Sequence, residues 1–251
     1  MTPEFIGIIP ARYASTRFPG KPLALIGGIP MIERVVRRAS QALDRVVVAT
    51  DDERIFRCVE SFGGEAVMTS GSHRSGTDRC REALDRIGST AQVVINIQGD
   101  EPFVEPAQIE ALKGCFTADP DVSLATLVRR FDPALGWDAL FNPNTPKVVL
   151  DNRGNAVWFS RSIIPYVRNY PWQEWIGRAE FYTHVGMYGY RADTLRAITM
   201  LPQSAAEIAE SLEQLRWLQN GYDIRTAVTD LPTVGIDTPD DLRRAEELLN
   251  R

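Results

Sequence analysis

Short apolar runs, separated by segments with helical spacing, form the main pattern of this chain. The clearest runs are Phe5–Ile9, Arg45–Thr50 and Gln92–Ile97, and the first and last are apolar on both faces. Runs of this kind are typical of parallel strands buried between two layers of helices. Because strand-like and helix-like segments alternate, the pattern predicts an α/β fold with a Rossmann-like, open and mostly parallel twisted sheet.

The same pattern sets the expected order of elements. Pro10 cannot donate to a strand ladder, so the first strand should stop there, and Asp51 is expected to cap the helix after the second strand. The expected strands are 5–9, 45–50, 65–68, 92–97, 122–128, 184–190 and 223–228, and the expected helices are 30–43, one through Ile55 to Val59, 77–87, 106–116, 194–200, 205–220 and one from Pro239.

The rhythm changes after residue 133. Residues 133–171 are rich in Pro, Asn and aromatic side chains, and 148–159 read as a hairpin that turns at Asn152-Arg153-Gly154. We therefore expect a single domain over 1–251, with an inserted β-rich lobe at approximately 133–180.

Composition narrows the classes of function. The net charge is −5 and no basic stripe is visible, so a nucleic-acid surface is not expected and any anion site must be local. Three widely spaced cysteines without a Cys-x-x-Cys pair indicate neither a disulfide framework nor a zinc ribbon. With no signal-like start and no apolar run of membrane length, the sequence predicts a cytoplasmic protein that has no membrane partner.

Local charge points to an anion site directly after the first strand. No Asp or Glu occurs between Glu4 and Glu33, whereas Arg12, Arg17 and Lys21 fall in this stretch. The loop lies at the carboxyl end of a strand, where open α/β sheets bind ligands, and its small residues allow backbone N–H groups to approach a phosphate. The loop therefore predicts a polyphosphate site.

Two familiar phosphate loops are excluded. A Walker loop needs Ser or Thr after its Gly-Lys pair and an earlier Gly, but those positions hold Pro22 and Ser15. The dinucleotide fingerprint needs Gly-x-Gly, which occurs nowhere in the chain. A nicotinamide or flavin enzyme is therefore not expected.

Two carboxylates are candidate metal ligands. Asp100 follows the buried strand 92–97 and should enter the same crevice as the cationic loop, where one or two carboxylates with substrate phosphates suit Mg²⁺. The alternative is that Asp100 only caps a turn, and Asp237 could equally be the N-cap of the last helix.

Other polar residues have a structural and a functional reading. Ser75–Arg79 could offer backbone donors at a helix start, or be an ordinary capped helix. Arg161 could meet a carboxylate or pair with an acid. His184 could be a structural histidine, and Glu213 and Gln214 could be solvated positions of a helix. Because the chain contains only one other histidine, a histidine-based metal site is not expected.

Several of these segments together resemble one family, the 3-deoxy-D-manno-octulosonate (Kdo) cytidylyltransferases. The motifs that carry the resemblance are PARYASTRFPGKPL at 10–23, SGTDR at 75–79, NIQGDEP at 96–102, KVVLD at 147–151, FSR at 159–161, HVGMYGYR at 184–191, LEQLRWLQNGYDI at 212–224 and GIDTPDDL at 235–242. They run nearly end to end in the family's order.

The resemblance implies that the C2 hydroxyl of Kdo attacks the α-phosphate of CTP, giving CMP-Kdo and pyrophosphate with Mg²⁺. It implies the fold of the nucleotide-diphospho-sugar transferases. It assigns catalysis to Arg12, Lys21 and Asp100; nucleotide binding to Pro10, Ala11, Arg12, Ser15, Lys21, Ser75, Gly76 and Arg79; sugar binding to Gln98, Arg161, His184, Glu213 and Gln214; and metal binding to Asp100 and Asp237.

The resemblance also implies a homodimer that uses the inserted lobe, and a role in lipopolysaccharide or capsule synthesis. Alternatives remain: transfer to 8-amino-Kdo or a sialic acid, cytidylyl transfer to a sugar or polyol phosphate, and a regulatory nucleotide-binding protein without catalysis. Lys21, Asp100 and Asp237 together favour the enzyme, since binding alone does not require all three.

Overall fold

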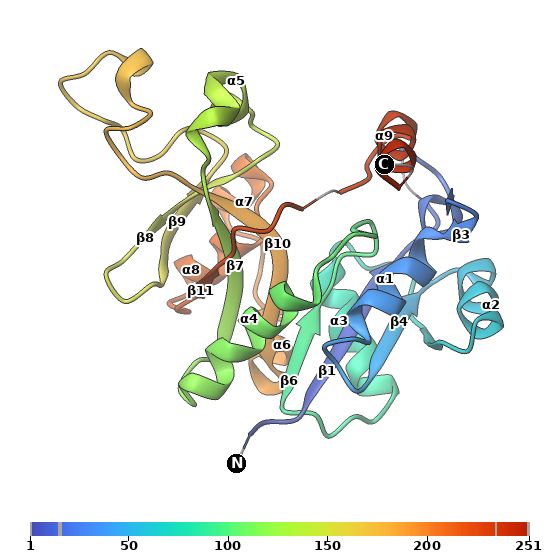
Figure 1. Ribbon diagram of the computed structural model, residues 1–251. Helices are drawn as coiled ribbons and strands as arrows, with labels where there is room; N and C mark the ends of the chain where they lie inside the picture. Colours follow the sequence, from blue (N-terminus) through green and yellow to red (C-terminus); the bar gives the residue numbers. More distant parts are fainter. Residues whose placement is uncertain (1, 15–16, 234, 250–251) are drawn as a thin grey trace.

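The computed structural model describes residues 2–14, 17–233 and 235–249. Within them, nine strands form one sheet with the path β11-β7-β10-β6-β1-β4-β5, to which the hairpin β8–β9 is added beside β10. β10 is antiparallel to both β6 and β7, and the other pairs along the path are parallel. The expected fold class is confirmed (Figure 1).

The strands are β1 Phe5–Ala11, β2 Leu25–Ile26, β3 Ile29–Pro30, β4 Val46–Thr50, β5 Glu65–Met68, β6 Val93–Asn96, β7 Leu124–Arg130, β8 Lys147–Leu150, β9 Ala156–Ser160, β10 Tyr182–Arg191 and β11 Arg225–Val228. The α-helices are α1 Met31–Ala39, α2 Glu53–Ser61, α3 Gly76–Arg86, α4 Pro106–Ala118, α5 Gly136–Phe141, α6 Ala192–Ile198, α7 Ala205–Glu210, α8 Gln214–Gln219 and α9 Pro239–Leu249, and the 3-10 turns are η1 Lys21–Leu23, η2 Pro133–Leu135 and η3 Trp172–Glu174.

The sheet is buried on both faces because its central strands are apolar throughout. In β1, Ile9 faces a cluster that includes side chains of α1, α2 and α4. Ile6 and Ile8 face the opposite cluster, which includes α3, α6 and α8. This three-layer arrangement brings the carboxyl ends of β1 and β6, which run parallel, to one edge of the sheet.

Three local predictions were wrong. β1 continues through Pro10 to Ala11, because its pairing with β6 already ends at Ile8, so the missing N–H has no ladder bond to lose. The helix expected over 205–220 is two helices, α7 and α8, separated at Ser211, whose backbone is left-handed at φ 50°. Asp52, not Asp51, caps α2 by accepting from the Arg54 N–H.

The hairpin in the inserted region is confirmed: β8 and β9 are antiparallel, and β8 also pairs with β10. Outside that hairpin, residues 133–180 form short helices, turns and loops rather than further strands of the main sheet. They have a small core of their own around Phe131, Leu140, Trp175 and Phe181. Figure 1 shows this lobe projecting away from the part of the sheet that carries α1 and α2.

No helix in the described part of the chain is both long and apolar enough to cross a membrane.

Candidate active site

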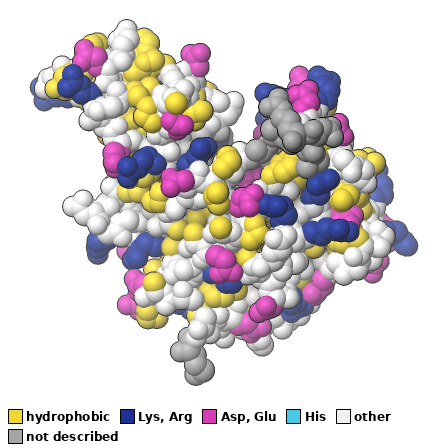
Figure 2. Space-filling model, viewed as in Figure 1, with side chains coloured by type: hydrophobic (Ala, Val, Ile, Leu, Met, Phe, Trp, Pro, Cys, Tyr) yellow, Lys and Arg dark blue, Asp and Glu magenta, His cyan; other side chains and the backbone are white. Residues whose placement is uncertain are grey.

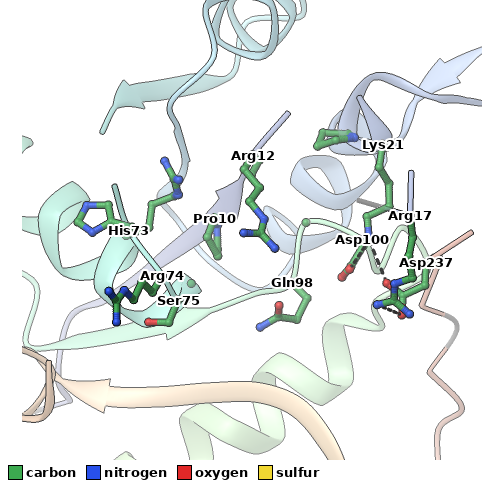
Figure 3. Close-up of a pocket in the computed structure, with 15 residues that line it drawn as sticks. Pro10, Arg12, Arg17, Lys21, His73, Arg74, Ser75, Gln98, Asp100 and Asp237 are labelled. Carbon is green, nitrogen blue, oxygen red and sulfur yellow. Dashed lines mark hydrogen bonds and ion pairs between the residues drawn. The ribbon is translucent and has the colours of Figure 1, made fainter. Parts of the chain in front are cut away.

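A cleft of about 310 Å³ opens at the edge where β1 and β6 end. Its walls come from the loop after β1, the residues before and within the first turn of α3, the loop after β6, and the segment before α9. Figure 3 shows the side chains converging from these elements. The residues that line it are Pro10, Ala11, Arg12, Arg17, Lys21, Pro22, His73, Arg74, Ser75, Gly76, Arg79, Gln98, Gly99, Asp100 and Asp237.

At one end of the cleft a single ammonium group lies between two carboxylates. Lys21 Nζ is 2.7 Å from Asp100 Oδ2 and 3.2 Å from Asp237 Oδ1, and the Lys21 side chain is only 14% exposed. Arg17 contacts the second carboxylate from the solvent side, with Nη2 3.3 Å from Asp237 Oδ2. Residues 216 positions apart in the sequence therefore share one charged site.

Backbone contacts hold the two carboxylates there. The Ile236 N–H donates to the Asp100 carbonyl at 2.9 Å, which fixes the segment bearing Asp237 against the loop after β6. Gly99 approaches β1 so closely that a Cβ at this position would be 3.0 Å from the Pro10 carbonyl oxygen. A larger residue would push Asp100 away from the cleft.

Asp237 is not the cap of the last helix, so that alternative is wrong. The Asp241 N–H donates to Thr238 Oγ1 at 3.2 Å, and Asp241 Oδ2 in turn accepts from the Thr238 N–H at 2.9 Å. These reciprocal bonds cap the start of α9 and leave the Asp237 carboxylate to Lys21 and Arg17.

The other end of the cleft is the amino terminus of α3. Ser75 caps this helix by accepting from the Asp78 N–H at 3.1 Å, and Gly76 lies against β1, where an added Cβ would be 3.2 Å from Pro10 Cγ. Free N–H groups at a helix start favour anionic ligands. Arg79 reaches the cleft, but its guanidinium is buried and donates to Thr69 Oγ1 at 2.6 Å and Asp51 Oδ2 at 3.1 Å.

Two cleft residues, His73 and Arg74, were missed by sequence reasoning. The His73 imidazole contacts the Glu82 carboxylate, which also accepts from the Ser70 N–H and from Arg86. These bonds offset the burial of Glu82 and lower its pKa to about 2. Their position in the sequence could have indicated a place in the cleft, because His73 and Arg74 directly precede the motif at 75–79.

Of the residues assigned to the sugar, only Gln98 lines the cleft, and its Nε2 donates to the Gly186 carbonyl at 2.9 Å. Arg161 instead donates to the carbonyls of Pro143, Glu210 and Ser211, and so ties the hairpin β8–β9 to the corner between α7 and α8. Its backbone N–H also donates to Glu210 Oε2 at 2.8 Å.

The remaining three lie behind the cleft. His184 contacts Thr126 Oγ1 at 3.0 Å, and burial lowers its pKa to about 4, which makes it neutral near pH 7. Glu213 accepts from Thr77 Oγ1 at 2.7 Å, next to the cap of α3. Gln214 is buried, and its Nε2 has no hydrogen-bond partner among the described residues. Their contact with a sugar stays a prediction.

The carboxylates at the Lys21 end of the cleft can hold a hard cation only if a bound ligand supplies further oxygen atoms. Among the described residues no three His, Cys, Asp or Glu side chains converge as a self-sufficient metal cage. Asp100 and Asp237, however, face the same nitrogen within 3.2 Å, and two carboxylates with substrate phosphates are sufficient for Mg²⁺. The residues therefore fit a nucleotide-dependent metal site. Of the predicted site residues, only Ser15 lies outside the described residues.

Comparison with known proteins gives the family. A family model described as cytidylyltransferase matches residues 6–224. A protein of Phocaeicola vulgatus named 3-deoxy-manno-octulosonate cytidylyltransferase is 57% identical over 248 residues, 99% of this chain and 98% of that protein. The chain belongs to the 3-deoxy-manno-octulosonate cytidylyltransferase family. A member from Parabacteroides distasonis is 58% identical over 243 residues, 96% of each chain.

Solved structures agree with this membership. A synthetase of CMP:2-keto-3-deoxy-manno-octonic acid, complexed with CTP, matches with TM-score 0.90 and 43% identity over 98% of each chain. A putative glucose-1-phosphate thymidylyltransferase from Bacillus anthracis matches at TM-score 0.64 and 18% identity, covering 97% of this chain and 94% of that one, which shows the shared fold. The cytidylyltransferase family thus uses a nucleotidyltransferase fold that extends beyond its own members.

Proposed function

We propose that this chain transfers the cytidylyl group of CTP to the C2 hydroxyl of Kdo, forming CMP-Kdo and releasing pyrophosphate. The observation that carries the proposal is the placement of Lys21 between Asp100 and Asp237 at the ligand-binding edge of the sheet. A purely regulatory nucleotide site needs cations but not a pair of acids beside them. Relatives with the Kdo cytidylyltransferase name and the CTP-bound structural match support the same reaction.

In this proposal the cleft positions CTP and neutralises its charge. Arg12 and Lys21 contact the triphosphate, with the backbone at Pro10, Ala11 and, outside the described residues, Ser15. Ser75 and Gly76 meet the nucleoside side at the start of α3, where Arg79 holds the loop in place. The sugar hydroxyl oxygen attacks the α-phosphorus and loses its proton to solvent, while the bond from the α-phosphorus to the bridging oxygen breaks and pyrophosphate leaves. Lys21 stabilises the charge that develops on the phosphates.

Mg²⁺ is the cofactor we propose, held by Asp100 and Asp237 together with phosphate oxygens. It supplies Lewis-acid stabilisation of the transferring phosphoryl group when bound. Lys21 contacts both carboxylates in the structure, so these acids would be shared between its ammonium and the metal, and the ammonium would also be near enough to turn toward the phosphates. Lys21 and the metal are therefore coupled parts of one site.

The sugar acid is assigned to Gln98, Arg161, His184, Glu213 and Gln214. Support comes from Gln98 in the cleft wall and from the buried Gln214 amide that lacks a partner among the described residues, since a ligand hydroxyl would satisfy it. Arg161 already bonds three carbonyls, so engaging the Kdo carboxylate requires it to exchange some of these bonds. An 8-amino-Kdo or a sialic acid is the alternative acceptor.

We also propose a cytoplasmic homodimer that serves lipopolysaccharide synthesis. The lobe at 133–180 exposes several large aromatic side chains, as is typical of a surface that binds another protein chain. Tyr166 is 73% exposed, Phe141 48% and Trp172 44%. Trp172 packs edge-on against Phe141 with ring centroids 5.3 Å apart. Figure 2 shows hydrophobic side chains gathered on this lobe. Light scattering should give a dimer for the wild type and a monomer for Trp172→Asp.

Pyrophosphate release with CTP and Mg²⁺ tests the reaction. Kdo, 8-amino-Kdo and N-acetylneuraminate are compared at equal concentration, with Asp100→Ala as the blank and omission of Mg²⁺ as a second control. Release with Kdo that disappears in both controls is the expected result. A preference for another sugar acid would change the proposed substrate but not the proposed mechanism. No pyrophosphate release with any of the three acids, despite CTP binding, would favour a regulatory protein without catalysis.

A further inference from the structure

Tyr13, in the cationic loop after β1, contacts Arg54 of α2, and neither residue has a role in the proposed binding of phosphate or metal. The guanidinium carbon of Arg54 lies 3.3 Å from the centroid of the Tyr13 ring, directly over its face. The ring is partly buried against the core formed with α1, α2 and α4. Neither Tyr13 nor Arg54 lines the cleft, although Arg12 and Lys21 do.

Arg54 is itself held in place before it meets the ring. Its Nε and Nη2 donate to the two carboxylate oxygens of Asp52 at 2.9 and 2.7 Å. Asp52 also caps α2 and donates its own N–H to Thr50 Oγ1 at 3.2 Å, which links it to the end of β4. The Arg54 side chain is 59% exposed, but these two hydrogen bonds pair its guanidinium with Asp52, and the same guanidinium lies over the Tyr13 ring rather than in the cleft.

The Tyr13 ring also lies close to Gly20. The Gly20 N–H donates to the Tyr13 carbonyl at 2.9 Å and thereby closes the loop between the two residues. Gly20 has φ +71°, and a Cβ there would lie 3.0 Å from two ring carbons of Tyr13. Glycine is thus required both for the left-handed backbone and for the close approach of the ring.

We propose that the Arg54–Tyr13–Gly20 stack is a positioning device for the cationic loop, an inference that rests on the proposed function. Tyr13 directly follows Arg12, and Gly20 directly precedes Lys21, so the stack fixes the backbone on which both cationic side chains are mounted. Tyr13 and Arg54 are positioning residues: they act on CTP only through Arg12 and Lys21. Small displacements of such groups have large effects on transfer reactions.

Steady-state kinetics with varied CTP and saturating Kdo test the proposal. Arg54→Met removes the charge and the planar guanidinium but keeps an unbranched apolar side chain, and Tyr13→Leu removes the ring. Each should lower kcat/KM for CTP by about two- to fivefold, in line with the strength of a cation–π contact at an exposed site. A second series with varied Kdo and saturating CTP should give an unchanged KM for Kdo. Tyr13→Phe, which keeps the ring, should behave as wild type.

Arg57→Met is the matched control. Arg57 is on the same helix and pairs with Glu53 at 2.9 Å, but its side chain is 75% exposed. The double variant Tyr13→Leu/Arg54→Met should lose no more than Tyr13→Leu alone, because Arg54 has no ring left to contact once Tyr13 is replaced. Equal kinetics for Arg54→Met and Arg57→Met, a loss in Tyr13→Phe, or a simple product of the two single losses would overturn the proposal.

A binding titration separates this inference from the proposed function. CTP affinity of each variant is measured without acceptor by calorimetry, alongside thermal unfolding. Weaker CTP binding in Arg54→Met with an unchanged unfolding midpoint supports the positioning role even if the wild type transfers nothing to Kdo. Unchanged CTP affinity in both Arg54→Met and Tyr13→Leu overturns it, whatever the acceptor proves to be.

Discussion

Replacing Lys21 by Met should move cation affinity and catalysis in opposite directions. In the structure the ammonium contacts Asp100 and Asp237, so it competes for the carboxylates that we assign to Mg²⁺. The substitution keeps the length and bulk of the side chain but leaves the two acids facing each other without that ammonium. A divalent cation should then enter more easily, although the transferring phosphate loses its closest ammonium.

The magnitude follows from the contacts. A charge-assisted hydrogen bond such as that at 2.7 Å to Asp100 contributes about 1.5–3 kcal/mol, whereas the contact to Asp237, whose side chain is 51% exposed, contributes less than about 1 kcal/mol. Displacing the ammonium therefore costs about 2 kcal/mol, or about thirtyfold in affinity. Loss of an electrostatic stabiliser of the transition state should lower kcat by about 10²- to 10³-fold.

Binding of Mn²⁺ without nucleotide, followed by electron paramagnetic resonance, measures the first effect, and pyrophosphate release measures the second. Arg37→Met is the control, because Arg37 pairs with Glu33 on α1, is 63% exposed and does not line the cleft, so it should change either quantity by less than about threefold. Weaker or unchanged Mn²⁺ binding in Lys21→Met would refute the shared site. A kcat within threefold of wild type would refute the role of Lys21 in transfer.

Three further predictions concern the support of the site. Arg79→Met should destabilise the protein by about 3 kcal/mol in urea unfolding, because it leaves the buried Thr69 hydroxyl and the partly buried Asp51 carboxylate without this donor; a loss below 1 kcal/mol would contradict this. Thr77→Val should raise KM for CTP severalfold by freeing Glu213 from the start of α3, and Thr77→Ser should restore it. Burial lowers the pKa of His184 from 6.5 to about 4 and raises that of Glu101 from 4.5 to about 7. As the pH falls from 6.5 to 4.5, His184 therefore lowers the stability of the folded protein, whereas Glu101 raises it. In EDTA, His184→Gln should therefore become more stable on acidification and Glu101→Gln less stable, each by up to about 2 kcal/mol relative to wild type; parallel pH profiles would contradict the assignment.

The sequence pattern was sufficient for the parallel strands because their burial is recorded in continuous apolar runs. The same pattern did not reveal the break at Ser211, since the helical spacing of Ile208, Leu212 and Leu215 continues across it. Tertiary contacts decide that corner: the carbonyls of Glu210 and Ser211 are turned to accept from Arg161. Helical periodicity describes which side is buried, not whether the backbone is continuous.

The convergence of the cationic loop with Asp100 in one cleft was predictable from the sequence, whereas the surroundings of Arg161 were not. Arg12, Lys21 and Asp100 follow buried strands, so their meeting at one edge follows from parallel topology. Asp237 joins them through a backbone bond from Ile236 to Asp100, a long-range contact that local sequence cannot specify. Arg161 was expected beside a carboxylate ligand, but its donors bond backbone carbonyls, whose positions depend on the complete lobe.

Transfer of label from [α-³²P]CTP to Kdo tests the central claim most directly. Wild-type protein with Mg²⁺ and Kdo is predicted to convert the label to CMP-Kdo in equal amount to the pyrophosphate released, and Asp100→Ala and Asp237→Ala are predicted to leave it in CTP. Label that stays in CTP with wild-type protein, or appears as free CMP independently of Kdo, would contradict cytidylyl transfer to this sugar acid.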